Sequence, residues 1–326
     1  MKNKNVFSPP RSAVEPGRPA AARALPDQRG AKVRAALIAW IVWMCTWCAP
    51  ADVLTGTWNL RWFPSGRAEH RASPRVEQAN VLDAAEVIRT GLSRRRPGDA
   101  AILFFQELRN ETACSNLVAA IGVTNLAVAG VSAFRDYDRR LGWQQTAIVT
   151  DLPVLDAGFT YWRRMKGILP PRGFTYAVLD AGTEGAIACY GVHLKSNYRA
   201  RSQQLREQNR LKREASVRQL LAHVKALRDV LGRPVTRVVI AGDFNTDPYS
   251  GQFQDEKTLS LLTEASFENV FDGAEPNERA THPGSKSYPD STLDFVFYRG
   301  FSARIARWLS PAVPLSDHRM VWLLLK

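Results

Sequence analysis

Short apolar runs along the chain end abruptly in polar side chains. The clearest is residues 237–241, which are mostly β-branched and lead directly into Gly242, Asp243 and Asn245. An apolar run without a polar gap predicts a strand that is buried on both faces. Asp243 and Asn245 are two residues apart, so they lie on the same side at the end of this strand. Either they form part of a site or they cap an ordinary turn, as Asx side chains commonly do.

The same pattern recurs in other parts of the chain. Strands are predicted over residues 53–62, 100–105, 142–149, 186–192, 291–298 and 320–325. Apolar residues at helical spacing predict helices over residues 75–92, 111–121, 198–231 and 257–264. The polar groups that these strands carry or deliver are Asn59, Glu107, His193, Asp294, Asp317 and His318. Burying a carboxylate at a strand end costs free energy unless a cation or a hydrogen bond compensates it. A functional site is therefore expected where the strands end.

Composition divides the chain into three regions. Residues 1–34 form a basic segment rich in Pro, Ala and Arg, and we expect this segment to be disordered. Residues 35–51 are an apolar run that ends in Ala-Pro-Ala, which predicts a secretory signal peptide, or a membrane anchor if it is not cleaved. The protein is therefore expected to be exported to the periplasm or secreted. Residues 52–326 show no internal linker or repeat, which predicts a single domain.

The charge and the cysteine content of the chain bear on its binding partner, on a disulfide and on a zinc site. The 326 residues carry a formal net charge of +13, which favours a polyanionic partner. The predicted helix over residues 198–231 has an arginine-rich face that either contacts nucleic acid or is simply solvated. In an exported chain, Cys114 and Cys189 are candidates for a disulfide, although two buried free thiols fit the sequence as well. No His/Cys pair has the spacing of a zinc site.

Three short motifs resemble those of a known superfamily. They are Gln106-Glu107, Gly242-Asp243-Phe244-Asn245 and Ser316-Asp317-His318. Together with the order of the other polar groups, they resemble the endonuclease/exonuclease/phosphatase superfamily over residues 53–326. The resemblance implies an α+β fold, a four-layer αββα sandwich of the DNase I type. In that fold two packed, mostly antiparallel β-sheets are flanked by helices, and the predicted elements are compatible with it.

The resemblance also implies roles for individual residues. Phosphodiester hydrolysis needs a cation at the phosphate oxygens, an activated water and stabilisation of the developing charge. The implied cofactor is Mg²⁺, with Mn²⁺ as an alternative, and the expected metal ligands are Glu107, Asn59 and Asp317. The expected catalytic residues are His193, Asp243, Asn245, Asp294 and His318. The expected phosphate-binding residues are Arg61, Asn245 and Thr281.

Within this set, Asp243 orients or deprotonates the attacking water, and Asp294 holds the imidazole of His318. Two positions depart from the pattern of some branches. Arg61 replaces an acidic residue, which suggests one metal site and an extra phosphate contact. Gln144 lies in the region where deoxyribonucleases have a glutamate that orients the residue matching His193. Its amide is able to hydrogen-bond to that ring, but it would stabilise a charged imidazole less well than a carboxylate.

Three functions follow as hypotheses. The leading one is a nuclease that hydrolyses DNA or RNA. The alternative enzyme is a sphingomyelinase-like or other phospholipid or inositol phosphate phosphoesterase, for which the aromatic and basic stretch 159–170 would be a membrane-contacting hairpin. The third is a non-catalytic module that binds polyanions. Nucleic acid or membrane lipid is thus the expected substrate; no protein partner is implied, and a monomer is expected.

Overall fold

The structure is a computed structural model that describes residues 52–67, 72–136, 139–230, 234–284 and 289–326. The expected disordered segment 1–34 and the expected signal peptide or anchor 35–51 lie outside the described residues. Within the described part of the chain, no helix is long and apolar enough to cross a membrane.

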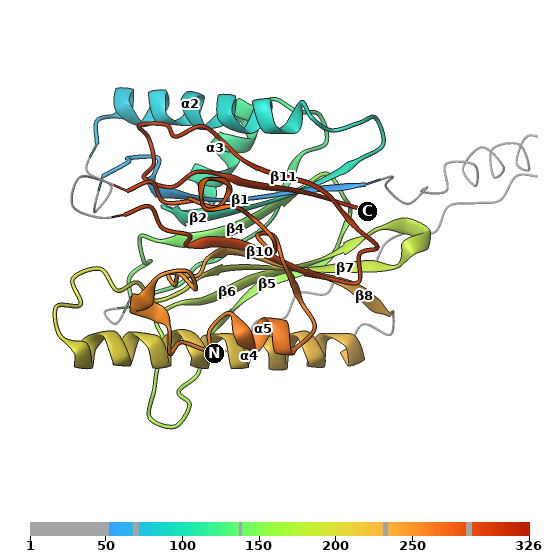
Figure 1. Ribbon diagram of the computed structural model, residues 1–326. Coiled ribbons are helices and arrows are strands. Elements are labelled where there is room, and N and C mark those ends of the chain that lie inside the picture. Colours follow the sequence, from blue (N-terminus) through green and yellow to red (C-terminus); the bar gives the residue numbers. More distant parts are fainter. Residues whose placement is uncertain (1–51, 68–71, 137–138, 231–233, 285–288) are drawn as a thin grey trace, which may run out of the picture. The chain divides into compact units, whose positions relative to one another are not determined.

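Two six-stranded β-sheets form the centre of the molecule (Figure 1). The first sheet has the order β11-β12-β1-β2-β4-β3, with bounds β1 (Val53–Phe63), β2 (Ala100–Leu108), β3 (Ala127–Val131), β4 (Gln145–Thr150), β11 (Arg304–Leu309) and β12 (Val321–Leu325). The second has the order β5-β6-β7-β8-β10-β9, with bounds β5 (Val154–Tyr161), β6 (Gly173–Asp180), β7 (Ala186–His193), β8 (Val235–Asp243), β9 (Glu268–Asn269) and β10 (Asp294–Arg299). β1 pairs with β2, and β7 with β8, in parallel; the other pairs are antiparallel.

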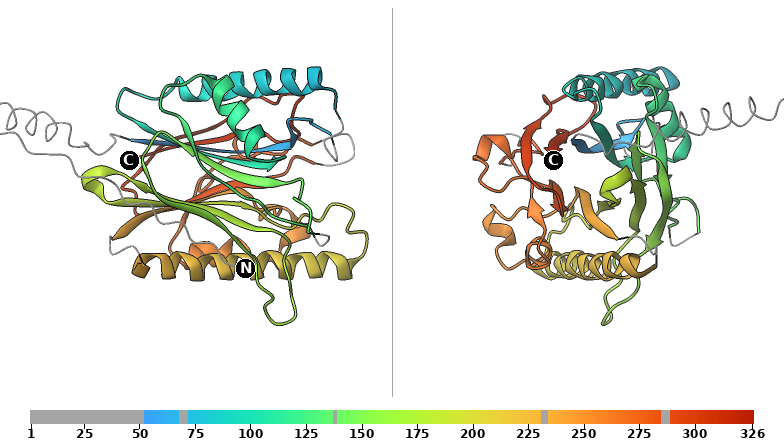
Figure 2. Two further views of the ribbon diagram at one scale, coloured as in Figure 1. Left: turned by 180° about the vertical axis from the view of Figure 1, so that it is seen from behind. Right: turned by 90° about the vertical axis from the view of Figure 1, so that its right-hand side faces the viewer.

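Helices cover the outer face of each sheet, so the molecule has four layers (Figures 1 and 2). The helices are α2 (Pro74–Leu92), α3 (Glu111–Ile121), α4 (Gln203–Val230) and α5 (Ser260–Glu264). Short 3₁₀ helices are η2 (Gly182–Glu184), η3 (Gly251–Phe253) and η4 (Pro276–Glu278). α2 and α3 lie on the first sheet, and α4 and α5 on the second. The predicted four-layer sandwich is confirmed.

Helix α2 shows how the sequence determines these layers. The Ser73 side chain accepts a hydrogen bond from the amide of Val76, which caps the helix, and Pro74 occupies the first turn, where its missing N–H costs nothing. Ala84 and Ile88, four residues apart, are fully buried against the first sheet. Another cluster of buried apolar side chains fills the space between the two sheets and continues to the face of the second sheet that α4 covers.

Strand register brings three predicted site residues to one level of the second sheet. His193 on β7 pairs with Asp243 on β8, and Asp243 pairs with Asp294 on β10. Gly242 allows this approach: its φ is 149°, and an added Cβ would lie 1.9 Å from the carbonyl oxygen of Val192. Any side chain at this position would push β8 away from β7. The glycine before Asp243 is therefore required by the sheet that carries the site.

The disulfide prediction for Cys114 and Cys189 is wrong, and both residues are free and buried. Cys114 lies on α3, in the apolar cluster outside the first sheet, whereas Cys189 lies on β7, in the cluster between the sheets. Two residues after Cys189 and on the same strand face, a Cβ added at Gly191 would lie 3.6 Å from Phe104 and 3.7 Å from Ile148 of the first sheet, so this face of β7 points toward the first sheet. The first sheet therefore separates the two sulfur atoms. The alternative of two buried thiols is the correct one.

Candidate active site

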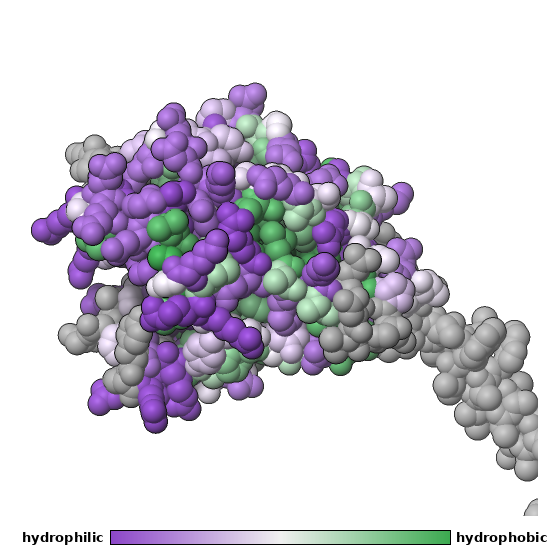
Figure 3. Space-filling model, turned by 90° about the horizontal axis from the view of Figure 1, so that it is seen from below, coloured by the Kyte–Doolittle hydropathy of each residue, from purple (hydrophilic) through white to green (hydrophobic). Residues whose placement is uncertain are grey.

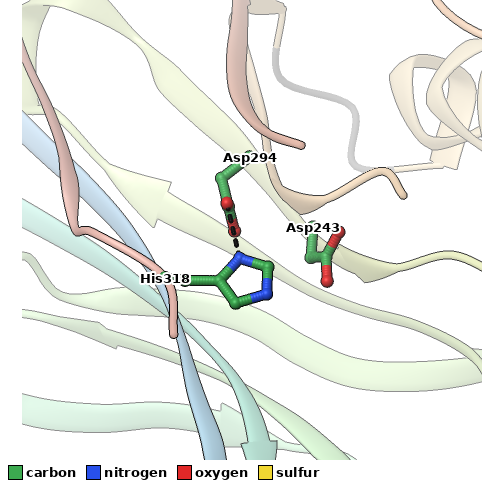
Figure 4. Close-up of side chains that lie close together, drawn as sticks. All are labelled: Asp243, Asp294 and His318. Atoms are coloured by element: carbon green, nitrogen blue, oxygen red, sulfur yellow. Dashed lines mark hydrogen bonds and ion pairs between the residues drawn. The ribbon is translucent and has the colours of Figure 1, made fainter. Parts of the chain in front are cut away.

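His318 and Asp294 form a buried ion pair that joins the two sheets. Nδ1 of His318, just before β12 of the first sheet, lies 2.7 Å from Oδ2 of Asp294, the first residue of β10 in the second sheet. Asp243 lies beside the edge of the ring that carries Nε2 (Figure 4). Ligand atoms of the three residues all lie within 4.8 Å of one another. His318 is thus held on one side and presents its second nitrogen to the site.

The electrostatics of this cluster give His318 a proton at neutral pH. Burial lowers the pKa of His318, but the carboxylates of Asp294, Asp243 and Asp317 outweigh burial and raise the pKa to about 10. Because Nδ1 faces Asp294, the N–H at Nε2 is the one available to a ligand. A charged imidazole in this position can donate a hydrogen bond or a proton to an anionic oxygen.

Asp243 is set up to accept a proton near neutral pH. It is 2% exposed, and burial raises its pKa to about 7. The positive charge of His318 opposes that rise, as do hydrogen bonds from the Asn59 side chain at 2.9 Å and the Asn245 amide at 2.8 Å. A carboxylate with this pKa is matched to the proton of an attacking water. Its geometry agrees with the role that the sequence resemblance implies.

Asn59 connects Asp243 to Glu107 across the two sheets. Nδ2 of Asn59 lies 2.9 Å from Oδ2 of Asp243 and 3.4 Å from Oε1 of Glu107. The other carboxylate oxygen of Glu107 accepts a hydrogen bond from the amide of Trp62 at 3.0 Å. The backbone here is strained: φ is 61° at Glu107, 52° at Trp62 and 53° at Asn245. Non-glycine residues with positive φ gather where the surrounding structure enforces a functional geometry.

The residues around Glu107 fit a hard divalent cation. Mg²⁺ prefers carboxylate oxygens and keeps several waters, so one or two protein carboxylates suffice. The hydrogen bond from the Trp62 amide goes to Oε2 of Glu107, not to Oε1. Oε1 of Glu107 and Oδ2 of Asp243 both lie near Nε2 of His193. Asp243, Asp294 and His318 form a second group that could hold a metal. Nδ1 of His318 is already bonded to Asp294, so Glu107 offers the better position.

His193 lies between the two carboxylates and is neutral. Nε2 of His193 is 3.7 Å from Glu107 and 3.6 Å from Asp243, beyond hydrogen-bond distance. Burial, followed by the charge of Arg172, holds the pKa of His193 well below its usual range. A bond from Gln144 to the ring is absent: the Gln144 carbonyl accepts from Arg172 at 2.7 Å, and Arg172 donates to the His193 carbonyl at 3.0 Å. Within the described residues, Nδ1 of His193 has no hydrogen-bond partner.

Four other predicted residues lie at the rim of the site or behind it. Asp317 is 46% exposed and faces Arg61, whose Nε lies 3.8 Å from Oδ2, so the two residues form an exposed ion pair at the rim. The Asn245 side chain donates to the Leu194 carbonyl at 3.3 Å. Thr281 is fully buried, and its hydroxyl accepts from the amides of residues 293 and 294. The structure therefore places Thr281 behind Asp294, where it supports the strand.

Sequence reasoning missed three residues that shape the site. Ser316 donates to the carbonyl of Asn59 at 2.6 Å and accepts from the amide of His318 at 3.0 Å, so it joins two site residues. The His282 ring lies 5.0 Å from that of His318, edge to face. Arg172 reaches the site from the β5–β6 connection. Ser316 was visible as part of its motif, and His282 as the neighbour of Thr281, but nothing local in the sequence marks Arg172.

Two arginines of the arginine-rich face of α4 are paired with carboxylates of the protein. Arg213 is fully buried and bonds to Glu256, with Nη2 at 2.5 Å. Arg210 pairs with Glu207 and Glu214 on the same helix. Arg213 is enclosed and cannot contact nucleic acid, and the charge of Arg210 is compensated by two carboxylates. Nucleic-acid contact by the exposed arginines of this face, such as Arg206 and Arg218, stays a prediction. α4 nevertheless lies on a face that hydrophilic residues cover for the most part (Figure 3).

The fold and this site together define the class of protein. The model of the Endonuclease/Exonuclease/phosphatase family matches residues 56–318, which include almost all of the described domain. The chain belongs to this family, whose members are metal-dependent phosphoesterases. No curated protein matches the chain in sequence.

Solved structures of the same fold come from several branches. An endonuclease/exonuclease/phosphatase from Beutenbergia cavernae is 19% identical, with a TM-score of 0.56 and coverage of 84% of this chain and 71% of that one. Truncated TDP2 from Caenorhabditis elegans is 12% identical, with a TM-score of 0.55 and coverage of 84% and 98%. Sphingomyelinase C from Streptomyces griseocarneus is 17% identical, with a TM-score of 0.54 and coverage of 84% and 99%. At these identities the likeness concerns the fold alone.

Proposed function

We propose that the protein is an exported, Mg²⁺-dependent nuclease that hydrolyses phosphodiester bonds of DNA or RNA. The observation that carries this proposal is the position of Asp243. It lies between the charged His318–Asp294 pair and the Asn59–Glu107 pair, and all of these residues except the partly exposed Glu107 are buried. This arrangement combines a proton acceptor, a proton donor and a carboxylate for a hard cation at one point. Phosphodiester hydrolysis requires these three elements.

Each residue of this cluster has its own role in the proposed hydrolysis. Asp243 orients the attacking water and accepts its proton. His318 donates a hydrogen bond from Nε2 to a phosphoryl oxygen, while Asp294 keeps the ring charged and in place. His193, which is neutral, can hydrogen-bond to the phosphate without adding charge. A cation held by Glu107 would neutralise the phosphate oxygens and stabilise the charge that builds up on them.

Charge supports nucleic acid as the substrate. Residues 52–326, the part that is expected to remain after export, carry 36 Lys and Arg against 29 Asp and Glu, a net charge of +7. The connection between β5 and β6 extends beyond α4 (Figure 1). This connection exposes three basic residues, Arg163, Arg164 and Lys166. Arg61, which is paired with Asp317 at 3.8 Å, adds a half-exposed guanidinium at the rim of the site. Basic side chains around a phosphodiester site attract a polymer of phosphates from several directions.

The alternatives receive less support. In the stretch 159–170, the rings of Phe159 and Tyr161 each lie 5.5 Å from that of Phe134, although both stay partly exposed. The connection that follows them exposes Arg163, Arg164 and Lys166, which is not the apolar tip that membrane contact requires. A module that only binds polyanions would have no use for a proton acceptor at Asp243 or for the strained backbone at Glu107. The buried Asp243 carboxylate and the positive φ of Glu107 both cost free energy, and a catalytic role explains why the protein keeps them.

One panel of substrates tests the proposal. The full chain is incubated with single-stranded DNA, duplex DNA, RNA, sphingomyelin and inositol phosphates, each with Mg²⁺ or with EDTA. The proposal expects cleavage of nucleic acid that EDTA abolishes, and little turnover of the lipid or the inositol phosphates. Turnover of sphingomyelin in the absence of nucleic-acid cleavage would assign the chain to the lipid-cleaving branch instead.

A further inference from the structure

A cavity of about 320 Å³ adjoins the candidate active site. Two of its lining residues also contact the site: the amide of Trp62 bonds to Glu107, and Arg172 donates to the carbonyl of His193. This volume falls within the range of small-ligand pockets, about 300–1,000 Å³. The phosphodiesterase chemistry proposed above does not use this cavity, so its lining needs a separate explanation.

Aromatic rings form much of the cavity wall. They belong to Trp62, Phe134, Trp143, Tyr161 and Trp162. The rings of Trp62 and Trp143 meet edge to face at 6.2 Å, and Trp143 has 45% of its surface exposed. Exposing an indole to water costs free energy unless a ligand covers it. A wall of this kind suits a flat ring that can stack against it.

Two buried donors in the same wall call for a ligand with hydrogen-bond acceptors. Nε of Arg172 and Nε1 of Trp162 are buried, and neither has an acceptor within the described residues. Trp162 is only 4% exposed. Neither nitrogen is accessible from the cavity as it stands, so each reaches a ligand only when its side chain shifts. Unpaired buried N–H groups are costly, so a ring that carries carbonyl oxygens or ring nitrogens gains free energy by satisfying them.

The charge of the wall excludes a cationic head group. Its charged residues are Arg135, Asp136 and Arg172, two cations against one anion. A quaternary ammonium group, such as choline, is bound by aromatic rings in the absence of competing cations, and it has no acceptor for Arg172 or Trp162. A nucleobase is planar, uncharged and rich in acceptors, so it meets all three conditions.

We propose that this cavity, the Trp143 pocket, binds one unstacked nucleobase next to the phosphate that is cleaved. This inference rests on the proposed nuclease function and specifies its substrate. A base can enter a pocket only after it leaves the helical stack, which is easiest in single strands and at strand ends. The enzyme therefore prefers single-stranded nucleic acid, or unpaired ends, to continuous duplex.

A cycle of protein and substrate changes tests the pocket. Wild type, Trp143→Ala, Trp143→Phe and the control Tyr198→Ala, which removes a ring that is 76% exposed outside the pocket, are assayed on single-stranded and duplex oligonucleotides. An abasic residue is then moved along the single strand, one position at a time. Trp143→Ala should lower kcat/KM on the intact strand by roughly 5- to 100-fold, the loss of one base–aromatic stack.

The abasic substrates distinguish stacking from a general loss of structure. At one abasic position, wild type should lose a similar factor, and Trp143→Ala should then lose nothing further. Trp143→Phe, which keeps a stacking face, should recover most of the rate, and Tyr198→Ala should match wild type. Equal effects of Trp143→Ala on intact and abasic strands, or equal rates of wild type on duplex and single strand, would overturn the nucleobase assignment.

A binding experiment tests the pocket independently of the proposed nuclease activity. Deoxyadenosine monophosphate and phosphocholine are titrated against the tryptophan fluorescence of the full chain. The nucleotide should quench the fluorescence in wild type and much less in Trp143→Ala, whatever the cleavage assay shows. Failure to cleave any nucleic acid despite this quenching would count against the nuclease and not against the pocket. Binding of phosphocholine, but not of the nucleotide, would contradict the pocket.

Discussion

His318 and Asp294 are joined by a 2.7 Å contact between groups that belong to different sheets of the sandwich. The side chain of Asp294 is fully enclosed, and that of His318 is 9% exposed. The proton donor of the site therefore exists only when the two sheets are packed together. Catalytic geometry and packing of the sandwich depend on the same ion pair.

Replacing Asp294 should change the protonation of His318. Burial lowers the pKa of His318, and Asp294 is the largest influence that raises it to about 10. In Asp294→Asn the imidazole should therefore lose its proton at a much lower pH, near or below the ordinary value of 6.5. NMR titration of the histidine rings measures this, with His223 on α4 as an internal control whose pKa should not move. An unchanged pKa of His318 would show that Asp294 does not control the protonation of this ring.

The same ion pair should make stability depend on pH. Because the pKa of His318 is higher in the folded protein than in the unfolded chain, the stability it contributes is complete below about pH 6.5 and is lost as pH rises through about 10. Urea unfolding of wild type and Asp294→Asn at a series of pH values tests this. The difference in unfolding free energy should be largest at the acidic end of this window and should shrink toward pH 10. A constant difference would argue against a charged His318.

Glu107→Gln should weaken the use of metal. A neutral amide is a poorer ligand for a hard cation than a carboxylate, so the Mg²⁺ concentration for half-maximal activity should rise, and excess Mg²⁺ should restore part of the rate. Glu264→Gln, an exposed carboxylate on α5, is the matched control and should leave the Mg²⁺ dependence unchanged. Activity of Glu107→Gln equal to wild type at limiting Mg²⁺ would remove Glu107 as a ligand.

Cys114 and Cys189 should remain unreactive while the protein is folded. Burial raises the pKa of Cys114 to about 12 and also raises that of Cys189, so neither forms a reactive thiolate near neutral pH. Iodoacetamide should modify both residues only after denaturation without reductant, as read by peptide mass mapping. A peptide pair linked through Cys114 and Cys189 would contradict the separation of the two thiols by the first sheet.

Arg213→Ala should destabilise the protein instead of weakening substrate binding. The guanidinium is fully buried and pairs with Glu256, so its removal leaves a buried carboxylate without its partner. Breaking a buried pair in this way costs about 3–5 kcal/mol. Arg218→Ala, an exposed position on the same helix, should change the unfolding free energy by less than about 0.5 kcal/mol. Denaturant unfolding of both variants measures the two changes in unfolding free energy. Equal changes would show that Arg213 is only a solvated charge.

The sequence predicted most of the elements that are buried on both faces, but it missed β6, which is largely buried inside the second sheet. β8 and β7 were visible because their apolar runs have no polar gap, and α3 was predicted over the same residues that the structure shows. β3 and β11 were missed because they lie at sheet edges and are only partly buried, so they lack such a run. β5 is also an edge strand, and its exposed residues gave the appearance of a surface hairpin.

Within the site, the sequence identified residues whose position follows from their own strand. Asp243 and His193 lie at strand ends, and the motif around His318 is local. Arg172 could not be identified in this way, because its role depends on a connection folding back to the carbonyls of His193 and Leu194. The separation of the two cysteines likewise depends on the order of the layers and not on their spacing.

The most direct test of the account is single-turnover cleavage of a 5′-labelled single-stranded oligonucleotide by wild type and Asp243→Asn across a range of Mg²⁺ concentrations. Asp83→Asn, an exposed carboxylate on α2, serves as the control. The account predicts that Asp243→Asn lowers the rate by about 10²-fold or more at every Mg²⁺ concentration, and that EDTA abolishes cleavage by wild type. A folded Asp243→Asn protein that cleaves within a few-fold of wild type would contradict the assignment of this cluster as the active site.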